Sequence, residues 1–188
     1  MRVGQGMAAG TAHRIVHLIV DVAGTPCALP QTDIREILPL PRLHAPPTVG
    51  GPVAGLLNLG GEPVPVVDLA ILFGLRDEAR ADDPYRQDPY RQDPYRHVVL
   101  ARSRPLGLLV DRALDVVAVA PDDLKPVEAA RSLNGCVVAE FAHDQTLVHR
   151  LSLDRILTVE ERTRLDAFAA TARERLARFG KPEATRFA

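Results

Sequence analysis

The hydrophobic pattern of the chain consists of short apolar runs separated by turns, and the most informative pair lies before the middle. Residues 54–59 and 64–67 are apolar runs on either side of the dipeptide Gly60-Gly61. A two-residue glycine link is typical of a tight β-hairpin, because its turn needs positive φ angles that glycine adopts at low cost. Asp68 follows the second run and favours the start of a short helix, because its carboxylate accepts hydrogen bonds from free backbone N–H groups. This stretch predicts a strand, a turn, a second strand and a short helix.

Further strands are expected on both sides of this hairpin. Alternate positions of residues 13–22 are apolar, which is the pattern of a strand with one buried face. The other expected strands cover residues 27–29, 97–101, 106–110, 113–120, 136–141 and 146–151. Residues 32–38 are expected to form a single helical or irregular turn between prolines, and residues 39–52 a loop. Short strands with frequent turns predict small β-barrels or a sandwich, not alternating β-α units.

The end of the chain has the pattern of an amphipathic helix over residues 158–180, followed by a tail over 181–188. Thr158 and Glu161 have the spacing of a capping box, in which each side chain meets a free backbone N–H group. Apolar side chains recur at helical spacing at Leu165, Phe168, Ala169, Ala172, Leu176 and Phe179. We expect this stripe to pack on the β-barrel part of the protein, and packing on another protein is the alternative.

Two segments have a composition that does not fit a packed element. Residues 1–11 are expected to be disordered. Residues 76–96 contain Asp-Pro-Tyr-Arg-Gln twice, followed by Asp-Pro-Tyr-Arg-His at 93–97. Each unit has a proline, which blocks helices and central strands, so we expect a flexible linker loop. A tyrosine-based docking motif is the alternative for these repeats.

The hairpin sequence resembles the central motif of CheW-like domains, Gly-Leu-Leu-Asn-Leu-x-Gly-Glu-x-Val-Pro-Val-Val-Asp-Leu, at residues 55–69. Other segments agree with the family in the expected order, at 27–30 with 33–37, at 107–111 with 114–117, at 134–136, and at 151–157 followed by Glu160 and Glu161. The resemblance implies a mainly β CheW-like domain over 12–157. It further implies two five-stranded SH3-like barrels, roughly 12–75 and 97–157, joined by the loop 76–96.

Proteins of this family are adaptors without enzymatic activity that couple chemoreceptors to the histidine kinase CheA. The resemblance therefore implies two partners, the regulatory domain of a CheA-type kinase and the cytoplasmic hairpin tip of a chemoreceptor. It implies a receptor-binding groove between the barrels, formed, motif by motif, by Ile34, Glu36, Gly55, Gly60 and Val116. It does not place the kinase contacts.

Gly60 departs from the family pattern, because the family usually has arginine at this position. An arginine offers a planar fork of donors that lysine or water cannot replace. Arg35 and Arg42 are candidates to compensate. The departure favours an adaptor for a non-standard receptor or a divergent pathway, and a CheW-like binding module with a different partner, outside flagellar motility, is the alternative function.

Composition limits the other function classes. A net charge of −1 over 188 residues does not provide the basic face of a nucleic-acid binder. No apolar run approaches the ~18 residues of a membrane span, and the first residues lack the apolar segment of a secretory signal. We therefore expect a cytoplasmic protein without direct membrane insertion, which receptor arrays could recruit to the membrane. Cys27 and Cys136 lie in apolar runs and are expected to be buried, reduced thiols.

A small β-barrel enzyme is the alternative from a different class. Asp68 and Asp111 both follow apolar strands, as the carboxylates of an aspartic-protease dyad do. They lack the glycine-containing turns that let two carboxylates share a proton, so we expect a helix cap and a turn residue. His13 and His17 have a zinc-ligand spacing only on a helix, and His149 is expected on a solvated strand face. No catalytic residue, metal site or cofactor is expected.

Overall fold

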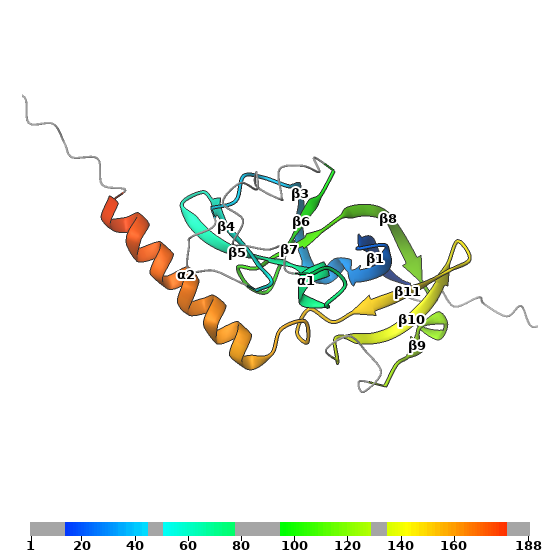
Figure 1. The fold of residues 1–188 in the computed structure, drawn as a ribbon. Coiled ribbons are helices and arrows are strands. Elements are labelled where there is room, and N and C mark those ends of the chain that lie inside the picture. The colour runs from blue at the N-terminus through cyan, green and yellow to red at the C-terminus, as the bar shows by residue number, and fades with distance from the viewer. Residues whose placement is uncertain (1–13, 45–50, 78–94, 129–134, 180–188) are drawn as a thin grey trace, which may run out of the picture.

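The computed structural model describes residues 14–44, 51–77, 95–128 and 135–179, which form two β-sheets and a long C-terminal helix (Figure 1). The first sheet contains, in spatial order, β8 (Arg112–Val119), β1 (Ile15–Val22), β2 (Thr25–Pro30), β11 (Thr146–Leu151), β10 (Val137–His143) and β9 (Lys125–Pro126). The second sheet contains β3 (Ile34–Pro39), β6 (His97–Ala101), β7 (Gly107–Val110), β5 (Glu62–Asp68) and β4 (Val53–Leu59). The helices are α1 (Leu69–Leu72) and α2 (Val159–Phe179).

This architecture confirms the predicted mainly β fold of two small SH3-like barrels with a C-terminal helix. The second sheet has the expected five strands, and the first has the two-residue β9 in addition. The strands do not divide between the sheets at the expected limits of 12–75 and 97–157. The first sheet combines β1 and β2 with strands from the later part of the chain, because β2 pairs in parallel with β11.

The segment 32–38 was predicted as a turn, and this prediction is wrong for most of its length. A 3₁₀ turn covers Gln31–Asp33, and β3 then pairs with β6, with a bulge between Ile34 and Glu36. The Arg102 guanidinium fixes this entry into the second sheet by donating to the carbonyl oxygens of Thr32, at 3.0 Å, and Ile34, at 2.7 Å. Pairing with β6 gives the segment its extended conformation, although its sequence does not alternate between apolar and polar residues.

The central hairpin has the predicted form. Gly60 and Gly61 have φ angles of 64° and 94°, as a tight hairpin turn requires. The Asn58 side-chain oxygen accepts a hydrogen bond of 2.8 Å from the Gly61 N–H and closes the turn. At the other end of β5, the Asp68 carboxylate accepts from the Ala70 N–H at 2.9 Å, which caps α1 as predicted.

Both faces of the central strands are buried, because the described residues form three hydrophobic clusters. In β6, Val98 faces a cluster inside the second sheet, whereas Val99 faces the largest cluster, to which both sheets contribute. The third cluster lies in the first sheet and contains Ile19, Ala28, Val119, Phe141 and Val148. This arrangement explains why several strands read as continuous apolar runs without alternation.

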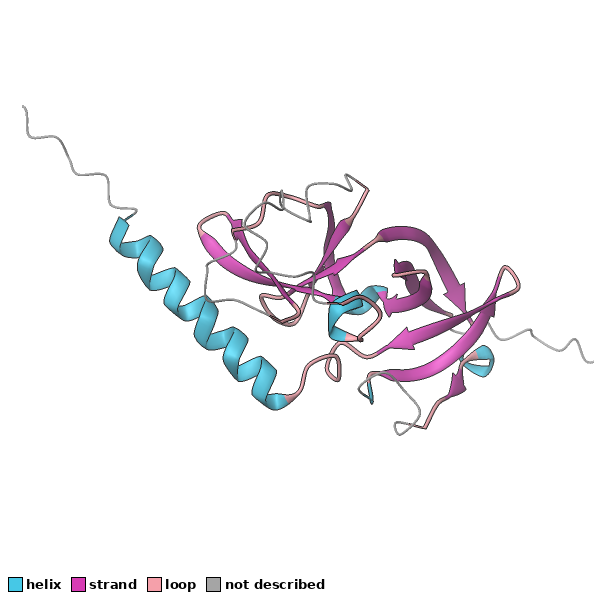
Figure 2. Ribbon diagram, in the orientation of Figure 1, coloured by secondary structure: helices cyan, strands magenta, loops and turns pink. Residues whose placement is uncertain are grey.

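Helix α2 begins with the predicted capping box and runs beside the β4–β5 hairpin (Figure 2). Leu165 and Ala169 are buried, which confirms packing of the apolar stripe against the β-barrel part. Leu176 is 44% exposed, and the Phe179 side chain lies outside the described ones. The first turns of the stripe are therefore covered, and the later turns extend beyond the sheet.

Three further predictions concern the cysteines, the repeats and the membrane. Cys27 and Cys136 are buried thiols as predicted, and burial raises the pKa of Cys27 to about 12 and of Cys136 to about 11. The predictions for 1–11, for most of 76–96 and for 181–188 lie outside the described residues. Among the described residues, no helix combines the length and the apolarity needed to cross a membrane.

Candidate functional site

Two of the expected groove residues lie on the β4–β5 hairpin and have different structural roles. Gly55 has a φ angle of 146°, and a Cβ atom built there lies 3.0 Å from the His44 carbonyl oxygen. Glycine at this position therefore allows the chain at 43–44 to cross β4 closely. Gly60 is at the exposed tip, and a Cβ atom there meets no atom within 4 Å. A larger side chain has room at the tip, although its backbone would be strained.

Ile34 and Glu36 lie on β3, at the opposite edge of the second sheet from β4. Ile34 is only 7% exposed and belongs to the largest hydrophobic cluster, so its side chain supports this edge from beneath. Glu36 is exposed to solvent. The two residues are close in the chain, but only the carboxylate of Glu36 is accessible to a partner.

Val116 lies on β8, the edge strand of the first sheet, and is 59% exposed. Leu114 on the same strand and Leu147 on β11 are exposed to a similar extent. Leu114 and Val116 are thus exposed on an edge strand, where apolar side chains are accessible to a partner. Ile34 with Glu36 on β3 and Gly55 on β4 therefore lie at opposite edges of the second sheet, and Val116 lies on an edge strand of the first sheet.

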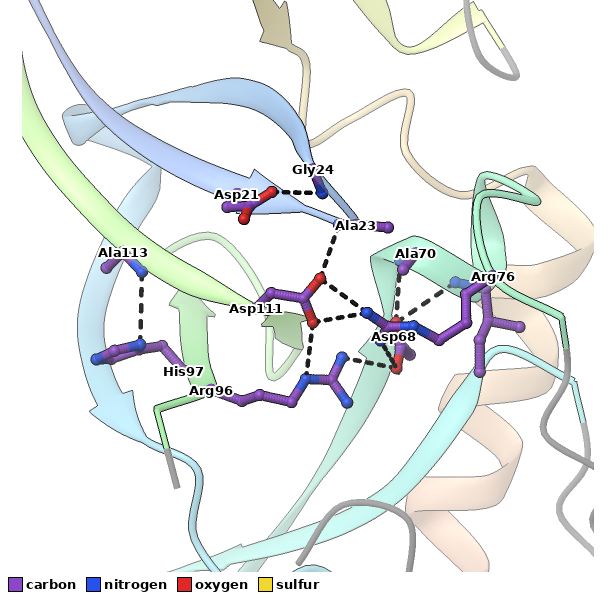
Figure 3. Close-up of polar contacts among 11 residues, drawn as sticks. Asp21, Ala23, Gly24, Asp68, Ala70, Arg76, Arg96, His97, Asp111 and Ala113 are labelled. Carbon is purple, nitrogen blue, oxygen red and sulfur yellow. Dashed lines mark hydrogen bonds and ion pairs between the residues drawn. The ribbon is translucent and has the colours of Figure 1, made fainter. Parts of the chain in front are cut away.

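A cluster of four charged side chains, which we call the clasp, joins the two sheets (Figure 3). It consists of Asp68, Arg76, Arg96 and Asp111. Arg96 donates from Nη2 to Asp68 Oδ2 at 2.9 Å, and its Nε lies 3.1 Å from Asp111 Oδ1. Arg76 donates to both oxygens of Asp111, at 3.0 and 2.9 Å. Asp111 Oδ2 also accepts from the Ala23 N–H at 2.7 Å, which attaches the β1–β2 turn of the first sheet.

Sequence reasoning placed Asp68 and Asp111 as a cap and a turn residue and did not find their arginine partners. Arg96 belongs to the third Asp-Pro-Tyr-Arg unit, and Arg76 stands at the other end of the repeat segment. The clasp therefore holds both ends of that segment. Its two guanidinium groups lie against the two carboxylates, whereas a protease dyad needs carboxylates that face each other and share a proton. The geometry is that of a structural ion-pair network.

The histidines considered as ligands have other surroundings. His13 lies outside the described residues, and His17 is fully buried beside the Phe141 ring. His17 Nδ1 lies 2.9 Å from the Ile15 carbonyl oxygen, and Arg150 Nε donates to His17 Nε2 at 3.1 Å. Burial lowers the pKa of His17. His149 Nδ1 contacts Glu140 Oε1 at 2.9 Å. In the described part of the chain, no group of three His, Cys, Asp or Glu side chains is placed to hold a metal ion.

An apolar groove of about 480 Å³ lies between α2 and the β4–β5 hairpin. Leu56, Leu57 and Pro63 line it from the hairpin, and Phe168, Ala172 and Leu176 line it from the helix. Sequence reasoning did not find this groove. The available signal was the length of the apolar stripe on α2, which continues beyond the surface that the sheet can cover.

The comparisons with known proteins agree with this architecture. The family model described as a CheW-like domain matches residues 17–161, which span both sheets and the start of α2. The chain therefore belongs to the CheW-like domain family, the adaptor and scaffold proteins of chemosensory signalling.

Among solved structures, the scaffolding protein TtCheW from Thermoanaerobacter tengcongensis has the same fold, with a TM-score of 0.65. The two sequences are 16% identical, and the match covers 84% of this chain and 96% of TtCheW. A search of curated protein sequences gave no match.

Proposed function

We propose that the protein is a non-catalytic adaptor that couples the cytoplasmic tips of chemoreceptors to the regulatory domain of a CheA-type histidine kinase. The observation that carries this proposal is the family match over 17–161, which includes both barrels and not one isolated motif. Two linked binding surfaces on one molecule raise the local concentration of kinase at the receptor, which is the physical basis of scaffolding.

The receptor-binding groove of this proposal contains Ile34, Glu36, Gly55, Gly60 and Val116. Glu36, Gly60 and Val116 contact the receptor, since each is accessible at the surface. Ile34 and Gly55 act indirectly, because Ile34 supports β3 from the core and Gly55 admits the crossing segment at 43–44. Apolar side chains such as Val116 supply affinity for a helical receptor tip.

Gly60 supports a specific form of this proposal, an adaptor for a divergent receptor or for a pathway outside flagellar motility. The hairpin tip has space for the arginine that the family usually has, so packing does not exclude it, whereas the φ angle of 64° favours glycine in the turn itself. Without that arginine, the tip cannot form a bidentate contact with a receptor carboxylate. Gly60→Arg is expected to change the affinity for the cognate receptor tip, and an unchanged affinity would remove the basis of this specific form.

The experiment is calorimetric titration of the full chain with two partners from the same genome, the kinase regulatory domain and a receptor hairpin-tip fragment. We expect saturable one-to-one binding of each partner and simultaneous binding of both. Val116→Asp is expected to weaken receptor binding and to leave the fold intact, because Val116 is mostly exposed. Leu147→Asp is the matched control on another strand of the same sheet.

Two results would contradict the proposal at different levels. A folded chain that binds neither partner would mean that the CheW-like fold serves a different protein. Unchanged receptor affinity in a folded Val116→Asp variant would show that the receptor does not bind at β8. An equal loss of receptor affinity in Leu147→Asp would show the same. The kinase titration would then still test the adaptor function.

A further inference from the structure

The groove between α2 and the β4–β5 hairpin is a second interaction surface that the proposed adaptor function does not use. Within the described chain, none of the five proposed receptor residues lines it. Its floor is formed by Leu56, Leu57 and Pro63, which are almost fully buried below the opening. Its outer wall is formed by Leu176, which α2 leaves 44% exposed. We propose that this groove binds an amphipathic helix of a partner protein, with an acidic residue beside the apolar face of that helix.

The backbone next to the groove favours a helix over an added strand. Strand addition needs free N–H and C=O groups along a sheet edge. β4 is the edge strand of the second sheet, but the backbone of Leu56 is already paired with His44 in both directions, at 2.8 Å each. An incoming strand would have to displace this bridge at the centre of the groove. Docking must therefore proceed through side chains, as helices in grooves do.

The dimensions of the helical wall fit a short helical segment. Lining residues of α2 run from Ala167 to Leu176, with Thr171 and Ala172 between them. At a rise of about 1.5 Å per residue, this wall is roughly 14 Å long, or two to three helical turns. Small side chains at 167, 171 and 172 let a second helix approach closely, because its own ridges fill the space between Phe168 and Leu176.

The charge of the groove lining favours a partner helix with an acidic residue. Arg175 lines the groove together with His44, and the described lining residues include no carboxylate. The nearby Arg173 is engaged with Glu62 at a distance of 3.4 Å. A single cation beside an apolar floor complements a glutamate or aspartate on the flank of an apolar helix face. A second copy of this chain fits less well, since the exposed end of its α2 carries three arginines, Arg173, Arg175 and Arg178, against the single carboxylate of Glu174, and would meet a cationic rim.

The test uses two fluorescent helical peptides and the full chain. Both peptides have leucines at i, i+3, i+4 and i+7, with either glutamates or lysines beside this stripe. Fluorescence anisotropy is expected to show saturable one-to-one binding of the glutamate peptide and at least fivefold weaker binding of the lysine peptide. Arg175→Glu should reverse this preference, and Leu176→Asp should weaken both peptides roughly fivefold to tenfold. Arg178→Glu is the matched control, because Arg178 is exposed on the same helix but does not line the groove.

Each other outcome overturns the proposal. Absence of saturable binding would mean that the groove does not bind a helix. Equal affinity for both peptides would mean that the groove does not select a helix with acidic residues. An equal effect of Arg178→Glu would show a non-specific charge effect and not docking in the groove. Sedimentation velocity addresses the second copy: a concentration-dependent dimer that Leu176→Asp abolishes would assign the groove to self-association. None of these variants changes a proposed receptor residue, so the result is independent of the receptor titration.

Discussion

The hydrophobic cluster inside the second sheet consists of aliphatic side chains. In the first sheet, by contrast, a histidine is buried and an arginine donates a hydrogen bond to it. The cluster of the second sheet consists of alanine, leucine and valine side chains from β4 to β7. In the first sheet, His17 is fully buried beside Phe141 and accepts a hydrogen bond from Arg150. Among the described residues, the buried histidine belongs to the first barrel, whereas the buried charged groups of the second barrel, Asp68 and Arg96, lie in the clasp.

The edge strands of the two sheets also differ in how far they are covered. The edge strand β4 of the second sheet pairs at Leu56 with His44, and α2 lies on the other side of the groove from it. The edge strand β8 of the first sheet exposes Leu114 and Val116. The comparison indicates a division of roles. The second sheet gives α2 an apolar surface to pack on, whereas the first carries the buried His17 and the exposed apolar edge, and the clasp joins the two sheets.

The largest expected effect concerns the clasp, because it contains a buried ion pair between Arg96 and Asp68. Arg96→Met leaves the Asp68 carboxylate, which is 1% exposed, without its closest cation. Removing one partner of a buried ion pair costs about 3–5 kcal/mol of unfolding free energy. Arg76→Met is the matched variant, and since this side chain is 39% exposed it should cost about 0–1 kcal/mol. Urea denaturation of both variants measures the difference, and equal midpoints would show that burial does not separate the two arginines.

The next effect tests how tightly the edge of the second sheet is covered. Gly55→Ala places a Cβ atom 3.0 Å from the His44 carbonyl oxygen, on a backbone with a φ angle of 146°. Strain and overpacking together should destabilise the protein by about 1–3 kcal/mol. Gly60→Ala is the control, because its φ angle is also positive but its Cβ atom meets open space. If thermal unfolding shows the same loss in both variants, the crossing of 43–44 over β4 does not restrict residue 55.

The features that the sequence predicted correctly depend on residues close together in the chain. The Gly60-Gly61 turn, the Asp68 cap and the capping box of Thr158 with Glu161 each involve a few neighbouring positions, whose chemistry determines the local backbone. The resemblance to the CheW-like family predicted the fold class and named the five groove residues. It did not show that Ile34 points into the core.

The features that sequence reasoning missed depend on contacts between distant positions. Asp68 and Arg96 are 28 residues apart, and the repeats between them drew attention to flexibility and away from a buried arginine at their end. β3 was missed because its partner β6 determines its conformation, while Arg35 and Glu36 are both exposed. The groove along α2 depends on how far the helix extends past the sheet, which no local pattern encodes.

The smallest expected effect tests the difference between the two cores through pH. Burial lowers the pKa of His17, so the native chain binds a proton there less tightly than the unfolded chain does. Below the ordinary histidine pKa of about 6.5, the unfolded chain is protonated at this residue and the native chain is not. This histidine should therefore reduce the unfolding free energy by about 1.4 kcal/mol for each pH unit below 6.5, until the native pKa is reached.

Two variants separate this contribution from the other titrating groups. His17→Gln keeps an acceptor for the Arg150 Nε–H but cannot be protonated, so its stability should fall less steeply with acid, by about one proton in the slope. Val148→Ala lowers the stability of the same cluster without removing a titrating group, and its slope should match that of the parent chain. Urea denaturation between pH 7.5 and 5.5 measures all three slopes. If the parent and His17→Gln lose stability in parallel, protonation of His17 does not distinguish the first core from the second.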